Sequence, residues 1–464
     1  MRRLSARFAV GSVRGVRRAV LATVLCLVAA GCGERSEPVV REATVAKLGP
    51  QPIRYDLDLR WDDAAARLSG TERIAVRNST GRELRRLWVR TWANAYGSCS
   101  KRHITVEVVG GGRGGRDAQK CTAKEIVLDR PLAPGAQITV ALRLELIVPD
   151  QFDRFGRTKD AAYLGSALPT LAVAIGARWR LPAYAERGEA WFSFPSSWRV
   201  KLETDPRLQV AATGTGTGRR GTWRLAATRA RDFVMAIGDF EVAERRAGAT
   251  RIRHYRTPGV RVQDARKSLD AAAAALTAFG RLYGPYDRRE LDVVDVRGRV
   301  AAAGIAMEYP ELILSPPSGS AVVHEVAHQW FAFILGNDPS REPWLDESFA
   351  EFSASRLPRS VTGGDRLGAC TAKPGQPRRT SPMEVWERTR GRAYTRQVYI
   401  GGACSLRRLQ DELGEARFDD MMRALVKRFR DRTWTGADFA AAVRRAAPEG
   451  FDADAFLRRE QFVG

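Results

Sequence analysis

The stretch His324-Glu325-Val326-Ala327-His328 constrains this chain more than any other part of its sequence. It contains two of the only four histidines among 464 residues. Histidines four positions apart on a helix project from the same face, so both imidazoles can bind one metal ion. The carboxylate between them is placed to take a proton from a metal-bound water. The stretch therefore predicts a helix that carries two zinc ligands, with Glu325 as the general base.

A second helix is predicted to bring the third ligand. A catalytic zinc takes three protein ligands and keeps its fourth position for water. Glu347 lies 19 positions after His328, in Trp344-Leu345-Asp346-Glu347-Ser348-Phe349-Ala350. Pro343 suits a first helical position, so Glu347 falls in the first turns of a helix that runs to about Arg356. The two helices together predict a hydrolytic site with a single zinc ion.

The ends of the first helix and one neighbour of the site are also predicted. Ser320 can cap the helix at its start, and Gly336 can end it. Glu351 lies four positions after Glu347 and can orient a zinc ligand through a hydrogen bond. A carboxylate at such a position is more often solvated, so we leave Glu351 outside the predicted site.

These motifs resemble those of the aminopeptidase N and leukotriene-hydrolase family of gluzincin zinc metallopeptidases. The resemblance begins with HEVAHQWF and WLDESFAEF. Upstream, Ile305-Ala306-Met307-Glu308-Tyr309 is similar to the family's G-x-M-E-N/Y motif. Downstream, residues 394–402, YTRQVYIGG, are similar to its segment ending in Y-x-K-G. The segments YDLDLRWDDAAARLSGTERIAVRN and RDFVMAIGDFE extend the resemblance, which spans roughly Gln51 to Leu413.

The resemblance implies a role for each site residue. The zinc ligands would be His324, His328 and Glu347. Glu325 would activate the bound water, and Glu308 would bind the free α-amino group of a peptide. Tyr399 would donate a hydrogen bond to the oxyanion of the tetrahedral intermediate. From the residues alone, Glu308 can also be a surface carboxylate beside a strand, Tyr399 can be a core aromatic, and Tyr394 is a rival for the role of Tyr399.

The sequence departs from the family pattern at several positions. Ile305 replaces the glycine beside Glu308, and Ile400-Gly401 stands where the family has a polar residue and lysine. Asp346 and Ser348 replace the common Asn and Gly on either side of Glu347. The P-C-x-D-E-P segment and the large C-terminal helical domain of larger members are not found. We therefore expect an open substrate pocket, and a second contact to the amine is not assigned.

The pattern of apolar residues predicts a multidomain chain. Residues 51–244 alternate between apolar and polar positions with frequent turns, which is typical of strands. Residues 245–464 are mostly helical, with helices expected near 262–283, 418–430 and 438–446 and a strand near 291–296. The resemblance implies an N-terminal β-saddle, all-β domain over 51–244 and a thermolysin-like α+β catalytic domain over 245–464.

The first residues are predicted to be a targeting segment. Six arginines precede an apolar run that is too short to span a bilayer. The run ends in Leu27-Val28-Ala29-Ala30-Gly31-Cys32, which resembles a bacterial lipobox. We expect a lipoprotein signal peptide over 1–31, a lipidated Cys32 and a polar tether over 32–50. The enzyme would then be held at the outer face of the cytoplasmic membrane or in the periplasm, although a simple secreted protein is the alternative.

Four cysteines are left for disulfides after export. Proximity along the chain favours Cys99 with Cys121 and Cys370 with Cys404, out of three possible pairings. Oxidising surroundings permit such bonds. Spacings of the C-x-x-C kind, which would favour zinc binding, are not found.

The net charge of +23 falls to +17 when the six arginines of the signal are removed. Such a balance favours anionic lipid headgroups or acidic peptides as partners. Basic residues are scattered, with few aromatic residues between them, so nucleic-acid binding is not expected. The sequence does not specify an oligomeric state.

The leading hypothesis is a zinc aminopeptidase that acts on peptides outside the cytoplasm. An endopeptidase of the same zinc class is the alternative, and in that case Glu308 would be incidental. A third hypothesis is a non-catalytic lipoprotein that uses the same scaffold to bind partners at the cell surface.

Overall fold

The computed structural model describes residues 52–150, 154–175, 178–296 and 306–463. Contacts group the chain into two compact units, residues 1–41 and 42–464, and every described residue lies in the second. The predicted signal peptide, Cys32 and the tether over 32–50 lie outside the described residues, as does Ile305. Among the helices that the structure describes, none combines the length and the apolar character needed to cross a membrane.

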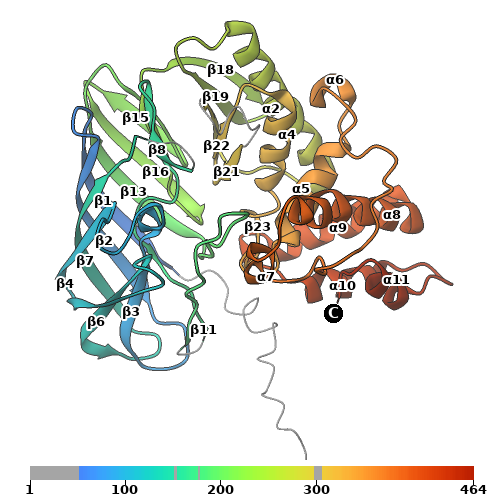
Figure 1. Ribbon diagram of the computed structural model, residues 1–464, viewed down its shortest axis with the longest axis horizontal. Coiled ribbons are helices and arrows are strands. Elements are labelled where there is room, and N and C mark those ends of the chain that lie inside the picture. The colour runs from blue at the N-terminus through green and yellow to red at the C-terminus, as the bar shows by residue number, and fades with distance from the viewer. Residues whose placement is uncertain (1–51, 151–153, 176–177, 297–305, 464) are drawn as a thin grey trace, which may run out of the picture. The chain divides into compact units, whose positions relative to one another are not determined.

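A seven-stranded sheet dominates the first half of the described chain. Strand β1 pairs antiparallel with β2 and parallel with β13, and the three run side by side in Figure 1. The strands in spatial order are β15 (Thr215–Arg219), β16 (Thr222–Ala230), β13 (Ser196–Glu203), β1 (Arg54–Asp62), β2 (Arg67–Arg77), β7 (Gln137–Ile147) and β4 (Ile104–Gly110). Apolar side chains alternate with polar ones along β1 and β7, so one face of the sheet is buried and the other is exposed.

Two four-stranded sheets complete the β-rich part. One has the order β10 (Thr170–Leu171), β3 (Leu84–Arg90), β6 (Ala123–Leu132) and β5 (Gly112–Ala118). The other has the order β14 (Gln209–Ala212), β17 (Met235–Gly238), β9 (Ala161–Leu164) and β8 (Phe155–Arg157). A short pair, β11 (Ala174–Ile175) and β12 (Arg178–Trp179), and the 3₁₀ helix η1 (Trp92–Tyr96) lie in the connections. Strands from all three sheets contribute to one apolar core.

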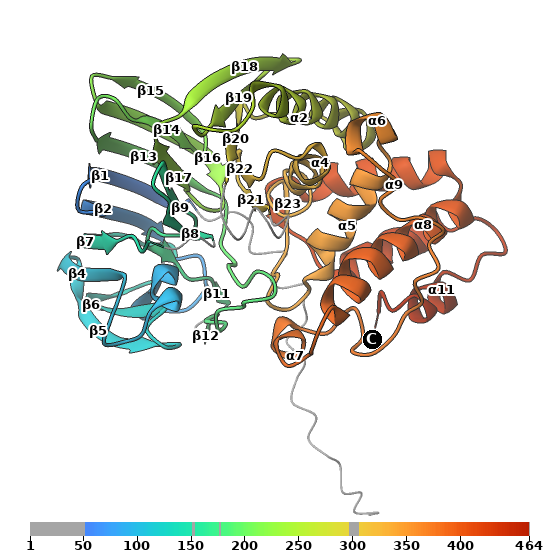
Figure 2. The ribbon, with the colours of Figure 1, turned by 45° about the horizontal axis from the view of Figure 1, so that its top comes forward.

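A five-stranded mixed sheet opens the second half. Its order is β18 (Glu241–Ala247), β19 (Thr250–Arg256), β20 (Glu290–Asp295), β22 (Leu312–Ser315) and β21 (Met307–Tyr309). The boundary predicted between residues 244 and 245 falls within β18, so this sheet begins before that boundary. Helix α2 (Val262–Tyr283) covers β18 and β19 (Figure 2) and has the bounds predicted from its apolar pattern.

Helices form the rest of the second half. The helices and short strands, in chain order, are α4 (Gly319–His328), β23 (Leu335–Gly336), α5 (Trp344–Ser355), α6 (Arg359–Thr362), α7 (Met383–Glu387), the π-helix η2 (Thr395–Ile400), α8 (Gly401–Leu413), α9 (Glu415–Phe429), β24 (Arg432–Thr433), α10 (Gly436–Ala446) and α11 (Ala453–Arg459). The strand predicted near 291–296 and the helices predicted near 418–430 and 438–446 correspond to β20, α9 and α10, with ends that differ by at most three residues.

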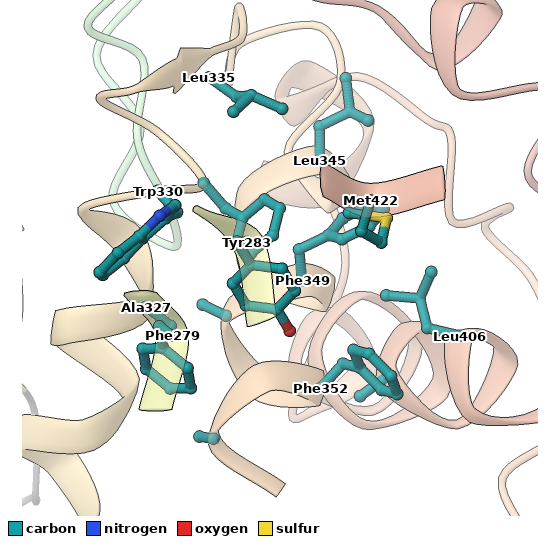
Figure 3. Packing of buried hydrophobic residues seen from close by; sticks show 14 of the residues in the cluster. Phe279, Tyr283, Ala327, Trp330, Leu335, Leu345, Phe349, Phe352, Leu406 and Met422 are labelled. Carbon is teal, nitrogen blue, oxygen red and sulfur yellow. The ribbon is translucent and has the colours of Figure 1, made fainter. Parts of the chain in front are cut away.

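The apolar core of the helical part fixes α4 against α5. Figure 3 shows Phe349 of α5 among residues from α2, α4 and α8. The rings of Phe331 and Phe349 are stacked with centroids 5.1 Å apart, and Tyr283 donates to or accepts from Ser353 of α5 at 2.9 Å. Because large buried side chains pack at crystal-like density, the two helices are held in one relative position.

The ends of α4 differ from the prediction. The helix starts after Ser318, whose hydroxyl accepts from the amide of Ala321 at 3.5 Å, and Ser320 is its second residue. It ends at His328 and not near Gly336. Gln329 explains the early end, because its side-chain amide donates to the carbonyl of Tyr309 and accepts from the amide of Glu311. These bonds tie the end of the helix to the edge strand β21.

Both expected disulfides are present. Cys99 is bonded to Cys121, and Cys370 is bonded to Cys404 of α8. The second bond joins α8 to the loop that precedes α7. It therefore closes a segment of 34 residues around η2, which carries Tyr399.

The β-rich core contains one buried carboxylate without a hydrogen-bond partner among the described residues, that of Glu72. Glu72 of β2 is fully buried on the same face as Leu68 and Ile74, and its carboxylate oxygens have no hydrogen-bond partner among the described residues. Burial raises the pKa of Glu72 well above its usual value. The contribution of Glu72 to stability is therefore most favourable below the ordinary pKa of glutamate and falls as the pH rises towards the folded-state pKa of Glu72.

Replacing Glu72 by an apolar residue of similar size should stabilise the protein at alkaline pH. We expect Glu72→Met to raise the free energy of unfolding at pH 8 by about 1–3 kcal/mol, because it removes an unsatisfied buried acid. The gain should shrink as the pH approaches 4. Urea unfolding across this pH range measures it, with Glu145→Met on the exposed face of β7 as the control. A loss of stability at pH 8 would contradict the assignment.

Candidate active site

Three side chains from two helices meet at one point. His324 and His328 come from one face of α4, and Glu347 comes from the first turn of α5. Nε2 of His324 lies 3.1 Å from Nε2 of His328 and 3.2 Å from Oε2 of Glu347. Nε2 of His328 lies 3.4 Å from the same carboxylate oxygen. The three atoms thus form a nearly equilateral triangle, as the sequence predicted for these ligands.

The spacing of these atoms suits zinc. Tetrahedral ligands at about 2.05 Å from a zinc ion lie about 3.3 Å from one another. The three distances between the donor atoms, 3.1, 3.2 and 3.4 Å, bracket this value. Two imidazoles and one carboxylate are also a ligand set that leaves one position for water. The residues present therefore fit a catalytic zinc ion in number, kind and spacing.

Hydrogen bonds at Nδ1 orient both histidine rings, so that each Nε2 faces the point between the three donor atoms. Nδ1 of His324 lies 3.0 Å from Glu351, and Nδ1 of His328 lies 3.2 Å from the carbonyl of Phe331. When Nδ1 donates to these oxygens, Nε2 is left with a lone pair for a metal. The carbonyl of Phe331 is available because α4 ends at His328. Because α4 ends at His328, a backbone carbonyl is free to orient the ring of His328.

Glu351 belongs to the site, contrary to our expectation of a solvated residue. It is buried, and Arg366 holds both of its carboxylate oxygens while also contacting Ser320 of α4. Although burial opposes ionisation, His324 and Arg366 lower the pKa of Glu351 to about 2. The sequence signal for this role was that Glu351 lies four residues after Glu347 and thus on the same face of the helix. The sequence could not show that Arg366 would donate to both carboxylate oxygens of Glu351.

Glu325 lies beside the donor atoms with a free oxygen. It is buried, and its Oε2 has no hydrogen-bond partner among the described residues. One of its oxygens lies within 4.8 Å of ligand atoms of Glu308 and His328. Burial raises the pKa of Glu325 to about 7. A carboxylate with such a pKa can take up and release a proton near neutral pH.

Two further carboxylates flank the donor atoms. Glu308 lies on the edge strand β21, and Glu189 lies in the loop between β12 and β13. Oxygens of Glu189, Glu308 and Glu347 all lie within 4.8 Å of one another. Arg154 donates to Glu189 at 3.2 Å and to the carbonyl of Gly188 at 3.1 Å. Glu308 is therefore buried in the site, not exposed beside a strand.

Glu189 was not found from the sequence. It follows Arg187-Gly188 in a loop without a recognisable motif, and its nearest partners in the chain are 35 residues away or more. Only the fold brings this loop beside β21 and α5. Glu189 lies beside Glu308, so it is a candidate for the second amine contact that the sequence left unassigned.

Burial and neighbouring negative charges raise the pKa of several of these acids. Burial and the charge of Glu308 raise the pKa of Glu189 well above its usual value. Burial and the charge of Glu347 raise the pKa of Asp346 to about 8, although Asn337 donates to it at 2.9 Å. Glu347 is the exception, because despite its burial the two histidines lower its pKa. The site is thus rich in negative charge and suited to a metal cation and an ammonium group.

Tyr399 reaches the same centre from the π-helix η2. Its hydroxyl donates to Oε1 of Glu347 at 2.5 Å, and its ring stacks on His324 with centroids 5.8 Å apart. Tyr394, the rival five positions earlier, is buried beside it with ring centroids 5.6 Å apart. The hydroxyl of Tyr394 has no partner among the described residues. Of the two, Tyr399 is the residue in contact with a predicted metal ligand.

A pocket opens beside Glu189 and Glu308. Aromatic side chains form part of its wall, namely Trp92, Trp191, Phe192, Tyr309 and Phe333. Glu189, Glu308 and Asp346 line it as well. Aromatic surface and carboxylates thus meet in one pocket.

Comparison with known proteins agrees with this geometry. Residues 318–459 match the model of the Peptidase family M1 domain. The chain is 25% identical over 429 residues to Aminopeptidase M1-B of Oryza sativa subsp. japonica, covering 82% of this chain and 46% of the rice protein. It is 26% identical over 205 residues to Aminopeptidase RNPEPL1 of Mus musculus, covering 38% of this chain and 27% of the mouse protein. The chain spans about half the length, or less, of these curated relatives.

Solved structures share the fold over most of the chain. An M1 zinc metallopeptidase from Deinococcus radiodurans superposes with a TM-score of 0.65 at 21% identity, covering 89% of this chain and 94% of that chain. A mutant of that enzyme with the substrate Tyr-Ser-Ala superposes with a TM-score of 0.62 at 20% identity, with the same coverage. The predicted fold class, a β-rich N-terminal part followed by a helical catalytic part, is confirmed.

The orientation of His324 by Glu351 should be measurable as metal affinity. We expect Glu351→Gln to weaken zinc binding about 10–100-fold, because a ligand that loses its outer hydrogen-bond partner is less basic and less well aimed. Competition with a chelating dye measures the change. Glu384→Gln is the matched control, because Glu384 also accepts from an arginine but lies exposed on α7. Equal affinity in the two variants would refute this role.

Proposed function

We infer that this chain, which belongs to the aminopeptidase N-like gluzincin family of metallopeptidases, removes the N-terminal residue of peptides with the help of one zinc ion. The observation that carries this proposal is the pair Glu189 and Glu308 beside the triangle of His324, His328 and Glu347. A carboxylate pair next to a hydrolytic metal site binds the ammonium group of a substrate and so fixes which peptide bond is cleaved.

The three ligands and Glu325 together provide for the attack of water. Zinc, when bound, lowers the pKa of a coordinated water and polarises the scissile carbonyl. Glu325 accepts the proton of the attacking water, since its Oε2 is free and its pKa lies near neutrality. After attack, the same carboxyl group returns the proton to the leaving amine.

Tyr399 stabilises the oxyanion that develops on the scissile carbonyl. Its hydroxyl lies 2.5 Å from Glu347, so it already points at the metal ligands. We propose that the oxyanion replaces Oε1 of Glu347 as the acceptor of this hydrogen bond. A donor of this kind is typically worth about 3–4 kcal/mol of transition-state stabilisation.

The amine site sets the register of the peptide. Glu308 approaches from β21 and Glu189 from the loop before β13, so an ammonium group between them faces two carboxylates. Arg154 holds Glu189 in place. The first side chain of the peptide then enters the aromatic pocket.

We also propose that the enzyme acts outside the cytoplasm. The support is the basic region followed by an apolar run and the lipobox-like segment that ends in Cys32. The two disulfides agree with an oxidising compartment. Lipid attachment at Cys32 would keep the enzyme on a membrane surface, where it meets extracytoplasmic peptides.

Hydrolysis of free and N-acetylated aminoacyl-p-nitroanilides tests the proposed activity. We expect the purified protein to cleave only the free substrates and to contain one zinc ion. Glu325→Gln should lower kcat by at least about 100-fold, since it removes the proton acceptor. Removal of zinc by a chelator should abolish turnover, and added zinc should restore it.

The controls separate an aminopeptidase from the alternatives. Glu189→Gln should lower kcat/KM for free substrates about 10–100-fold, as expected for loss of a charged hydrogen bond. Glu186→Gln, in the same loop but exposed, should leave it unchanged. Equal cleavage of acetylated substrates would show an endopeptidase instead. Bound zinc without turnover on any peptide would show a binding protein.

A further inference from the structure

The π-helix η2 changes the hydrogen bonding of the backbone around Tyr399. The amide of Gly401 donates to the carbonyl of Arg396, five residues earlier, as in a π turn. In an α-helix the same amide would donate to the carbonyl of Gln397. The wider turn therefore leaves the carbonyl of Gln397 without this donor, two residues before Tyr399.

The guanidinium of Arg379 donates a hydrogen bond to this carbonyl of Gln397. Its Nε donates to the carbonyl of Gln397 at 3.2 Å, and its Nη2 donates to the carbonyl of Gly401 at 2.9 Å. Its Nη1 donates to the carbonyl of Glu460, which follows α11. Arg379 thus holds one residue on each side of Tyr399 and joins both to the C-terminal segment.

Arg379, like Arg231, is a buried arginine that donates to three backbone carbonyls. The side chain of Arg379 is fully buried, and its hydrogen bonds go to backbone carbonyls, not to carboxylates. Its backbone amide donates to the side chain of Gln461 at 3.1 Å. Burial of a charge without a carboxylate in contact is costly, so it indicates a specific task. The planar donors of Arg379 bond to the turn that carries Tyr399 and to the end of α11.

Two serines support the same turn from other sides. Ser348, beside the ligand Glu347, donates to the carbonyl of Val398 at 2.6 Å. The hydroxyl of Ser405 lies 3.0 Å from the carbonyl of Gly401 and 2.7 Å from a carboxylate oxygen of Glu460, and it can donate its one proton to either. Residue 402 must be glycine here, because a Cβ would lie 1.9 Å from the hydroxyl of Ser348. The departures at Ser348 and Gly401 thus belong to one local arrangement.

We propose that Arg379 is a positioning residue for Tyr399. It fixes the π turn against α11, so that the tyrosine hydroxyl is held over Glu347 and the reacting carbonyl. This inference rests on the proposed function for the role of Tyr399. In this arrangement the C-terminal residues 460–462 are part of the support of the active site.

The proposal predicts which kinetic constant changes. Tyr399 acts on the oxyanion, which exists only in the transition state, so its misplacement lowers kcat and leaves KM nearly unchanged. A displacement of about 1 Å can cost roughly 100-fold in rate. Zinc binding should be unaffected, since Arg379 contacts none of the three ligands.

A double-mutant cycle with Arg379→Lys and Tyr399→Phe tests the proposal. Lysine keeps the charge but cannot bond three carbonyls in one plane. We expect Arg379→Lys to lower kcat about 10–100-fold, with KM and zinc content within about twofold of the parent. In the Tyr399→Phe background the same substitution should have less than about a twofold effect. Arg356→Lys, at a half-buried arginine between α5 and α9, should leave kcat unchanged.

Independent effects of the two substitutions, or loss of zinc in Arg379→Lys, would overturn the proposal. If Arg379→Lys does not fold, Ser405→Ala serves as the second variant, with a smaller loss of kcat that must also vanish beside Tyr399→Phe. Amide hydrogen exchange tests the proposal without measuring enzyme activity. Exchange should rise at residues 395–402 and stay unchanged in α4 and α5, and unchanged exchange at 395–402 would contradict the proposal. An inactive parent protein would refute the proposed function alone.

Discussion

The structure depends on how six buried carboxylates are balanced by positive charge. Acids of this kind cannot stay ionised in a desolvated site without cations beside them. The six are Glu189, Glu308, Glu325, Asp346, Glu347 and Glu351. Arg154 and Arg366 hold the outermost two, and the histidines of α4 face Glu347. A zinc ion and the ammonium group of a peptide, the two cations that the proposed reaction requires, would bring three positive charges to the other four carboxylates.

The fold serves this balance by bringing separate elements to one point. Helices α4 and α5 are locked together by the aromatic core around Phe349, which fixes the distances between the ligand atoms. Strand β21 lies at the edge of its sheet and presents Glu308, and the loop before β13 presents Glu189. The π-helix η2 brings Tyr399 over Glu347. Each polar group therefore has a separate rigid support, as transition-state stabilisation requires.

Much of this could be predicted from the sequence where the signal was local. The ligands follow from the spacing on two helices, and α2 follows from a long amphipathic run without a breaker. Glu189, Arg154 and Arg379 could not be predicted, because their roles come from contacts across the fold. The end of α4 at His328 was missed because Gln329 bonds to β21, a tertiary contact that overrides the helical pattern.

The proposed function requires that His324, His328 and Glu347 hold one zinc ion. Diffraction data collected on either side of the zinc absorption edge, from crystals of the purified protein, test it directly. We expect a single strong anomalous peak about 2.0–2.2 Å from Nε2 of both histidines and from an oxygen of Glu347. A peak at another set of residues, or no peak in protein supplied with zinc, would contradict it.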